Sequence, residues 1–391
     1  MQKNLYLRPI VKIMAIEIKK VQSSADLRRF IRFANQLYAD SPFYCPPLFI
    51  DELQTFNKKK NPSLEFCDFQ CFLAYKNGEI VGRICALINP VANEHWNCKK
   101  VRFGWADFVD DLEVSKALFD AVKEWGKERG MEQMNGPVGF TDFDHQGLLL
   151  EGFEYVCPMA SLYNYPYYQK HFEAYGLTKE ADWVEYLVKT PTEVPERLAR
   201  ISEISKTRYK LHVVKDMPKK EIIKRYGEQA LNTIDTAYSV LYNYQPLTKK
   251  QKEYYVNMYF PLLNFDFCTF VVNEKDEVVG AGIGMPDITK ALQKCQGKLF
   301  PFGWYHILKA LKAKRFTHFN LLLIAVRPDY RNTGVDAIFF AEQIPMALKY
   351  GMQTTETTAI LETNNSNRAN WERFEYTIHK RRRAYIKDLN S

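Results

Sequence analysis

Hydrophobic and polar positions repeat along the chain with two different periods. Residues 69–82 alternate in the manner of two strands, and Asn77-Gly78 between them favours a tight hairpin turn. Residues 115–129 carry apolar side chains at helical spacing, and Gly130 marks the end of that segment. A chain that mixes such strands with amphipathic helices is expected to form an α/β protein.

The same pattern occurs a second time. Residues 267–280 repeat the order of residues 69–82, with each matching position displaced by 198. The glycine that ends the helix at Gly130 recurs at Gly351, a displacement of 221 residues. This displacement exceeds that of the hairpin by 23 residues, which places an insertion in the second copy between residues 280 and 319. Each half reads as strand, helix, hairpin, strand, helix, strand, so we expect two domains of one fold.

Each copy also begins with a strand and an amphipathic helix, at residues 15–21 and 27–38 and again at 211–215 and 219–241. Gly176 and the segment 190–195, rich in Pro and Thr, punctuate the chain between the copies. We therefore predict domains at 14–180 and 181–391, and 391 residues agree with two domains of about 150–200 residues each.

Composition narrows the class of protein. No apolar run approaches the ~20 residues of a membrane span, and the first thirteen residues do not form a signal peptide, so Met14 is an alternative start. Eight cysteines without metal-ligand spacing favour reduced thiols in a cytoplasm and no metal. The net charge of +8 is dispersed and no nucleic-acid motif is present, so we expect no nucleic acid partner.

The second copy holds a candidate anion site. A strand at 319–326 runs through Arg327–Gly334 into a helix at 335–350. A basic turn ahead of a helix offers unpaired backbone N–H groups and the positive end of the helix dipole, and Gly334 permits close approach. Most turns of this kind bind nothing, so the motif is weak by itself.

The order strand, Val326-x-Pro-x-x-Arg331-x-x-Gly334, helix, strand resembles the acyl-CoA-binding motif of the GNAT superfamily of N-acyltransferases. The resemblance implies an α/β fold with a mixed sheet, built as two tandem GNAT-like domains, in which loop amides of the second hold the pyrophosphate of acyl-CoA. The residues that it implies as coenzyme contacts are Ala325, Val326, Arg331, Asn332, Thr333, Gly334, Val335, Asn364 and Asn367.

The two copies differ at this loop. At the displacement of 221, Asp110–Glu113 stands where the second copy has Arg331–Gly334, and three carboxylates do not favour a pyrophosphate. We therefore expect only the second domain to bind the coenzyme. Asp336 departs from the Gly or Ala that is usual in the family, and its charge requires a side chain that points away from the pyrophosphate. A decayed coenzyme site in a non-catalytic binding protein is the alternative.

Ser41–Leu48, Gly136–Val138 and Asp144–Phe153 look like a narrower family, the double-domain GNAT proteins typified by bacterial ceramide synthases and their uncharacterised relatives, and the similarity spans residues 16–388. This resemblance implies transfer of an acyl group from acyl-CoA to a primary amine bound between the two domains. The acceptor is either a small-molecule amine or a long-chain, sphingoid-type lipid amine.

Amide formation needs a base for the amine and an acid for the leaving thiolate. GNAT proteins often use a Tyr near the last helix as the acid, for which the candidates are Tyr376 and Tyr385, and we choose Tyr385. His145 is the candidate base in a loop between the copies, oriented by Asp144 or else by Asp142 or Glu151. The alternatives are a packed Tyr and a loop that caps its own backbone. The aromatic run Tyr163–Tyr168 either lines a pocket or packs as a hinge.

The insertion carries a basic amphipathic segment at 300–315. From Trp304 onward, Ile307, Leu308 and Leu311 fall on one helical face, with basic residues opposite, as in helices at a membrane interface. Lys380–Arg383 would add attraction to anionic lipid, and the alternatives for this run are a solvated end or a partner for coenzyme phosphates. The alternative is a surface helix packed on the sheet. The expected location is therefore cytoplasmic, either free or peripheral at the inner face of the membrane.

Overall fold

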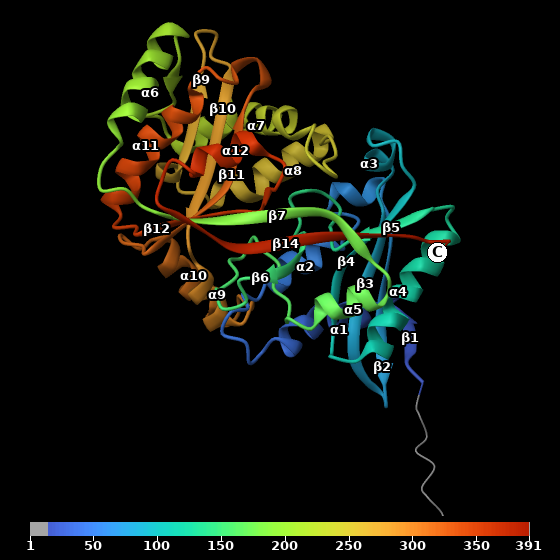
Figure 1. Ribbon diagram of the computed structural model, residues 1–391. Coiled ribbons are helices and arrows are strands. Elements are labelled where there is room, and N and C mark those ends of the chain that lie inside the picture. The colour runs from blue at the N-terminus through green and yellow to red at the C-terminus, as the bar shows by residue number, and fades with distance from the viewer. Residues whose placement is uncertain (1–14, 391) are drawn as a thin grey trace, which may run out of the picture.

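The computed structural model describes residues 15–390 and shows two halves joined by one sheet (Figure 1). The alternative start at Met14 lies outside the described residues. The first half contains β1 (Glu17–Lys20), α1 (Ser24–Leu37), α2 (Phe49–Thr55), β2 (Asp68–Lys76), β3 (Glu79–Ile88), α3 (Pro90–His95), β4 (Lys100–Phe108), α4 (Leu112–Lys127), β5 (Gln133–Gly136), β6 (Leu148–Glu151) and α5 (Tyr168–Ala174).

A long strand, β7 (Thr178–Lys189), leads into the second half. This half contains α6 (Glu196–Arg208), β8 (His212–Val213), α7 (Lys219–Tyr238), α8 (Lys249–Tyr259), β9 (Cys268–Val272), β10 (Val278–Pro286), α9 (Thr289–Cys295), α10 (Gly303–Leu311), β11 (His318–Val326), α11 (Val335–Lys349), β12 (Thr354–Thr357), β13 (Ile360–Leu361), α12 (Asn365–Trp371) and β14 (Tyr376–Asp388). The predicted mixed α/β class is confirmed.

The repeat is visible in the pairing of the strands. Each half has an antiparallel hairpin, β2–β3 or β9–β10, followed by a strand that runs parallel to a later one, β4 to β5 or β11 to β12. The turn at Asn77-Gly78 has positive φ at both residues, as the sequence predicted for a tight hairpin. The insertion lies between β10 and β11, where the second half has two helices, α9 and α10, while the first half has only α3 between β3 and β4.

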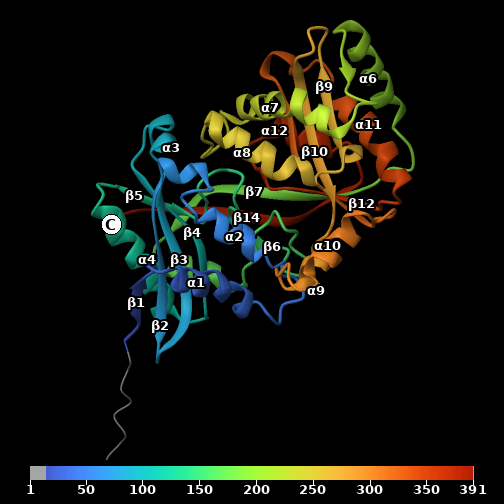
Figure 2. The same cartoon turned by 180° about the vertical axis from the view of Figure 1, so that it is seen from behind.

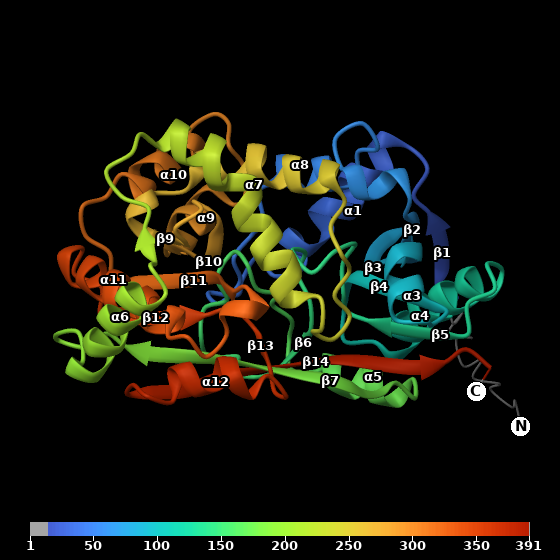
Figure 3. The same cartoon turned by 90° about the horizontal axis from the view of Figure 1, so that it is seen from above.

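The two halves share their central strands. The sheet runs in the order β1-β2-β3-β4-β5-β14-β7-β12-β11-β10-β9-β8, so β7 and β14 lie between β5 of the first half and β12 of the second. Figure 3 shows these two long strands crossing from one half to the other. The C-terminal strand thus completes the first half, where Tyr385 pairs with Gly136. The division at residue 180 stays a prediction, and it falls inside β7.

The core of the first half follows the predicted helix face. Leu118 and Val122 of α4 are fully buried against β4 and β5, and Trp125 is nearly so. Tyr163 and Tyr168 are buried in the same core, so these two residues of the aromatic run pack inside the first half and do not form a hinge between the halves. All eight cysteines are unpaired. Within residues 15–390, no helix is both long and apolar enough to span a bilayer.

Candidate functional site

The predicted phosphate loop lies between the end of β11 and the start of α11. Pro328–Tyr330 form a short 3-10 turn, and Asn332 and Gly334 both have positive φ. Within the described chain, no acceptor is bound by the backbone N–H groups of the residues that open α11, which are Asn332, Gly334, Val335 and Asp336. Four free amides at a helix N-terminus form a suitable cradle for an anion.

The strands next to this loop separate. β11 and β12 pair from His318 to Leu321, and Thr358 still donates to the carbonyls of Leu321 and Leu322 at 3.1 and 3.0 Å. Beyond Thr358, β13 pairs with β7 and not with β11. A bulge in β11 opposite Ile283 and Gly284 accompanies the change. The side chains of Leu321–Ile324 stay partly exposed although β11 lies inside the sheet. An elongated ligand can therefore reach the backbone of β11 at this split.

The charge that Asp336 brings to the loop is compensated. Its carboxylate accepts a hydrogen bond from Arg373 at 3.2 Å. Arg331 donates only to the carbonyl of Ala237, at 3.1 Å, so its guanidinium has no carboxylate partner among the residues described. Arg327, in contrast, is held by Asp329 and Glu277. Arg331 is thus the cation of this loop that remains for a phosphate.

Gly334 has a packing role as well as a conformational one. Its φ is +86°, and an added Cβ would lie 2.2 Å from Oγ of Ser205 in α6. Ser205 also donates to the carbonyl of Thr333 at 2.6 Å. The loop is therefore seated on α6, and a large side chain at Gly334 would disturb this contact as well as any ligand.

The corresponding place in the first half is closed. The turn between β4 and α4 is only Val109–Asp111, and the side chain of Asp111 caps the helix and pairs with Lys76 at 2.6 Å. Leu112 and Glu113, which correspond to Thr333 and Gly334 at the displacement of 221, belong to α4. His171 of α5 binds Asp110 and Ser115, both at 2.8 Å. The helix N-terminus of the first half is thus occupied by its own chain.

Asn364 and Asn367 have local partners. Asn364 accepts from the backbone of Asn367 and caps α12, and Asn367 accepts from the indole of Trp371 at 2.9 Å. Ala325 faces the core beneath α7, while Val326 packs near α11. The side-chain oxygens of Asn364 and Asn367 are thus used within α12, and the role of these four residues as coenzyme contacts stays a prediction.

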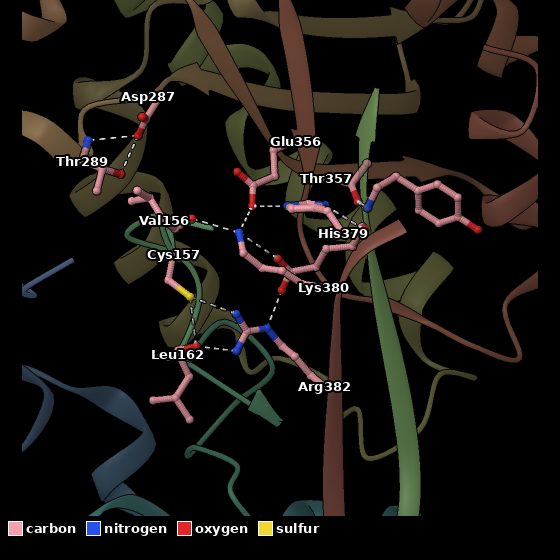
Figure 4. Close-up of polar contacts among 12 residues, drawn as sticks. Val156, Cys157, Leu162, Asp287, Thr289, Glu356, Thr357, His379, Lys380 and Arg382 are labelled. Atoms are coloured by element: carbon pink, nitrogen blue, oxygen red, sulfur yellow. Dashed lines mark hydrogen bonds and ion pairs between the residues drawn. The ribbon is translucent and has the colours of Figure 1, made fainter. Parts of the chain in front are cut away.

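A buried charged cluster lies where β12, β7 and β14 run side by side (Figure 4). Glu356, Glu185, His379, Lys380 and Arg382 form it. Lys380 pairs with Glu356 and donates to the carbonyl of Val156 at 2.9 Å, and Arg382 pairs with Glu185 and donates to Leu162. Segment 156–162 belongs to the first half, so the cluster joins both halves.

The charges in this cluster stabilise one another. Burial alone would lower the pKa of Lys380, but the carboxylates of Glu185 and Glu356 outweigh burial and raise it. Burial likewise favours neutral Glu185, but Arg382 and Lys380 hold the pKa of that carboxyl below its ordinary value. Glu185, Glu356 and His379 have the spacing of a metal site. Lys380 and Arg382 already neutralise those carboxylates.

The hydrogen bonds of His379 locate a proton. Nδ1 lies 3.0 Å from the carbonyl of Glu185, which can only accept, so Nδ1 is a donor. Nε2 lies 3.0 Å from Oε1 of Glu356. An ionised carboxylate also only accepts, so a proton is shared between His379 and Glu356. No described residue donates to Oε2 of Glu356, which is left for a substrate.

Sequence reasoning missed this cluster, because Lys380–Arg383 was interpreted as one exposed basic run. Lys380 and Arg382 are about 1% exposed, and Arg381 and Arg383 pair with carboxylates on other residues. The run is therefore not a lipid-facing surface, and that interpretation is wrong. The available signal was the alternation of a strand, which puts residues 380 and 382 on one face.

An apolar cavity of about 70 Å³ lies on the opposite face of the sheet, beneath α11. Phe319, Leu321 and Ile324 of β11 line it together with Phe339, Phe340 and Ala347 of α11. Trp371 and Phe374 close it from the side of α12. Its lining does not include Trp304 or any other residue of α9 and α10.

Known proteins were compared with the chain as a whole. No family model matches it. Protein YghO of Escherichia coli (strain K12) is 29% identical over 384 residues, which cover 93% of each chain. The bacterial ceramide synthase of Caulobacter vibrioides is 26% identical over 385 residues, which cover 96% of this chain and 98% of the relative.

Solved structures settle the architecture. A tandem GNAT protein from the clavulanic acid biosynthesis pathway superposes with a TM-score of 0.53 at 10% identity, and covers 96% of this chain and 98% of its own. A GCN5-related N-acetyltransferase from Sphaerobacter thermophilus gives 0.50 at 10% identity, with 96% of each chain covered. The chain has the tandem GNAT fold. This fold and the curated relatives together support a GNAT-type acyltransferase.

The tandem GNAT fold does not bring Tyr385 to the loop. Tyr385 is buried in the core of the first half, where its ring lies 5.1 Å from that of Phe172. Burial raises the pKa of its phenol to about 12, and its hydroxyl makes no hydrogen bond within the described residues. The structure thus places Tyr385 as a core residue and not beside the predicted coenzyme contacts.

Asp144 and His145 lie between the halves of the tandem GNAT fold but bind separate groups. Nε2 of His145 is 2.8 Å from the carbonyl of Met159, and Asp144 accepts from the backbone of Thr141 at 2.9 Å. Burial raises the pKa of Asp144 to about 6. The predicted dyad is therefore not connected by a hydrogen bond, and each member holds the local backbone.

Proposed function

We propose that this protein transfers an acyl group from acyl-CoA to a primary amine, with the loop of the second half holding the pyrophosphate. The free amides of Asn332, Gly334, Val335 and Asp336 at the start of α11 carry this proposal. They lie beside the split between β11 and β12, along which the pantetheine arm would run. Arg331 supplies an uncompensated positive charge at the same place.

The charged cluster offers a proton acceptor for the amine. A neutral amine attacks the thioester carbonyl, so that an N–C bond forms and the C–S bond breaks. Oε2 of Glu356 would take the proton that the amine loses. The proton shared with His379 would pass to the departing thiolate, which leaves the cluster with its original number of protons. Glu356 lies on β12, one residue before the last pair with β11.

The acceptor is proposed as a long-chain amine. The similarity to a protein named bacterial ceramide synthase over almost the whole chain supports this class. The same similarity is the support for a long acyl chain, because the cavity beneath α11 lies on the other face of the sheet from Glu356 and gives none. Thiol release measured with acetyl-CoA and with long-chain acyl-CoA, each against small amines and long-chain amino alcohols, tests both assignments. Turnover only with acetyl-CoA and small amines would contradict them.

Calorimetric titration with CoA tests the loop. Asn332→Asp adds a negative charge among the free amides at a residue with φ of +62°, which Asp tolerates. It should weaken CoA binding by about three- to tenfold. The control is Asn77→Asp, at another exposed Asn with φ of +55°, on the hairpin of the first half. Equal affinity for both variants would show that the pyrophosphate binds elsewhere.

Glu356→Gln tests the proton acceptor. Gln keeps the acceptor for Lys380 and His379 but cannot take a proton, so kcat should fall by about a hundredfold or more while CoA affinity is retained. Glu362→Gln, at an ion-paired residue nearer the surface, is the control and should keep kcat. Full activity of Glu356→Gln with an unchanged pH profile would place the base elsewhere.

A non-catalytic binding protein is the second candidate. The motive for this candidate is Asp336, whose carboxylate would repel a pyrophosphate. The pairing of Asp336 with Arg373 compensates that negative charge. The two candidates differ in one measurement. CoA binding without thiol release from any acyl-CoA and amine combination would favour the binding protein.

A further inference from the structure

The insertion of the second half forms a surface of its own. Helices α9 and α10 and their connections, residues 287–317, lie at the outer edge of that half (Figure 2). The inner side of α10 packs through Ile307 and Leu311 on Leu292 of α9 and on Cys45 of the first half. The amide of Gln293 also donates to the carbonyls of Pro42 and Tyr44, both at 2.9 Å. The insertion is thus held firmly against both halves.

The outer side carries large apolar side chains that nothing covers. Phe300 is 77% exposed and Phe302 is 71% exposed. Trp304, Tyr305 and Leu308 are also exposed, and together these five residues form what we call the aromatic patch. The predicted apolar face of α10 is therefore divided, since Ile307 and Leu311 point inward and Leu308 points outward. Clustered exposed aromatic residues of this kind mark an interaction site.

Positive charge surrounds the aromatic patch. Between residues 288 and 317 there are seven basic residues and no Asp or Glu. All seven side chains are exposed, and none forms an ion pair with any residue in 15–390; we call them the basic rim, and they are Lys290, Lys294, Lys298, Lys309, Lys312, Lys314 and Arg315. Elsewhere on the surface many Lys side chains do pair, as Lys206, Lys210 and Lys215 show.

We propose that the aromatic patch and the basic rim dock this protein on a lipid surface that carries anionic headgroups. Aromatic side chains enter the interfacial layer of a bilayer, and unpaired Lys and Arg are attracted to the negative headgroups around them. An acidic protein surface would satisfy the rim but offers little to exposed Phe300 and Phe302. A membrane satisfies the patch and the rim together.

Docking in this way would place the boundary between the halves close to the bilayer. The inner side of the insertion contacts Met159 and Met285, and Met159 accepts from His145 in the loop between the halves. The proposal does not depend on acyl transfer, because its test measures binding alone. If the acceptor is a lipid amine, the same surface would bring the protein to its substrate.

Vesicle flotation with the full chain tests the proposal. Wild-type protein should float with vesicles of phosphatidylcholine containing about one third phosphatidylglycerol, but not with phosphatidylcholine alone, and should release at about 1 M salt. Lys309→Glu with Lys312→Glu should lower the fraction bound by at least about tenfold. Lys58→Glu with Lys59→Glu, at exposed unpaired lysines of the first half, is the control and should bind as wild type.

A second pair of variants tests the apolar part. Phe302→Ser should lower binding by about tenfold. The control is Val240→Ser. Val240 is 70% exposed and lies outside the insertion, so this variant should bind vesicles as wild type does. Both variants alter exposed side chains, and thermal unfolding is expected to match wild type. Absence of flotation with anionic vesicles at low salt, or binding of duplex DNA through the same lysines without vesicle binding, would overturn the proposal.

Discussion

Arg373 donates to the carboxylate of Asp336 across 3.2 Å, and this pair links the segment just after α12 to the first turn of α11. The pair explains how an acid is tolerated beside the free amides of a predicted pyrophosphate site. Arg373 neutralises the charge and draws the carboxylate toward α12. The pair thereby connects α11 with the segment after α12, next to the loop at Arg331–Gly334.

The first prediction concerns this pair. Arg373→Ala should weaken CoA binding by about three- to tenfold, because it leaves the carboxylate of Asp336 uncompensated at the helix N-terminus. The double variant with Asp336→Asn should regain most of the lost affinity. Titration calorimetry measures both. Without recovery in the double variant, Arg373 would act on the coenzyme directly and not through Asp336.

The second prediction concerns Tyr385. Because its hydroxyl has no hydrogen-bond partner in the described chain, Tyr385→Phe should change the free energy of unfolding by less than about 1 kcal/mol and leave thiol release unchanged. Tyr38→Phe, in the same core, should cost about 1–2 kcal/mol because the hydroxyl of Tyr38 donates to Asp107 at 2.8 Å. Denaturant unfolding compares the two. A large loss of activity in Tyr385→Phe would restore the catalytic role expected from the sequence.

The third prediction concerns the buried cluster. Arg382→Leu should lower the free energy of unfolding by about 3 kcal/mol, because it leaves the buried carboxylate of Glu185 with only the more distant Lys380, at 3.7 Å. Arg381→Leu, on the other face of β14, should cost less than about 1 kcal/mol, since its partners Glu151 and Glu362 are partly exposed. Thermal and denaturant unfolding measure the difference. Similar costs for both variants would mean that the cluster is hydrated.

The fourth prediction concerns pH. Burial raises the pKa of Asp142 to about 7 from an ordinary value of 3.8. The folded protein therefore holds a proton that the unfolded chain releases, so stability is lost as pH rises from about 4 to about 7. Asp142→Asn keeps an acceptor for the backbone of Gln245 and should reduce this loss by an amount on the order of 1 kcal/mol.

Denaturant unfolding at several pH values measures this change. Asp40→Asn, at an exposed carboxyl, should leave the slope of stability against pH as it is in wild type. A parallel pH dependence in Asp142→Asn and wild type would assign the proton to another group. Asp144, whose pKa burial raises to about 6, is the next residue to test.

Local elements could be predicted because their causes are local. Three features illustrate this, because each depends on only a few neighbouring residues. They are the alternation in β2 and β3, the positive φ at Asn77-Gly78 and the helical spacing of Leu118 and Val122. The repeat could be found for the same reason, while phosphate binding by the loop at Arg331–Gly334 stays a prediction. The short turn at Val109–Asp111 even strengthens the predicted contrast between the halves.

The sequence alone therefore determined the α/β class, the repeated order of elements and the position of the turn at Arg331–Gly334 in this tandem GNAT fold. Only the tertiary structure decided that β14 closes the first half, which buries Tyr385 there and buries Lys380 and Arg382 beside Glu356 and Glu185. The periodicity of a strand tells which side chains share a face. Which side chains lie next to that face depends on the strands that pair with β14, and β7 is about two hundred positions away in the sequence. No local pattern in the sequence shows this pairing.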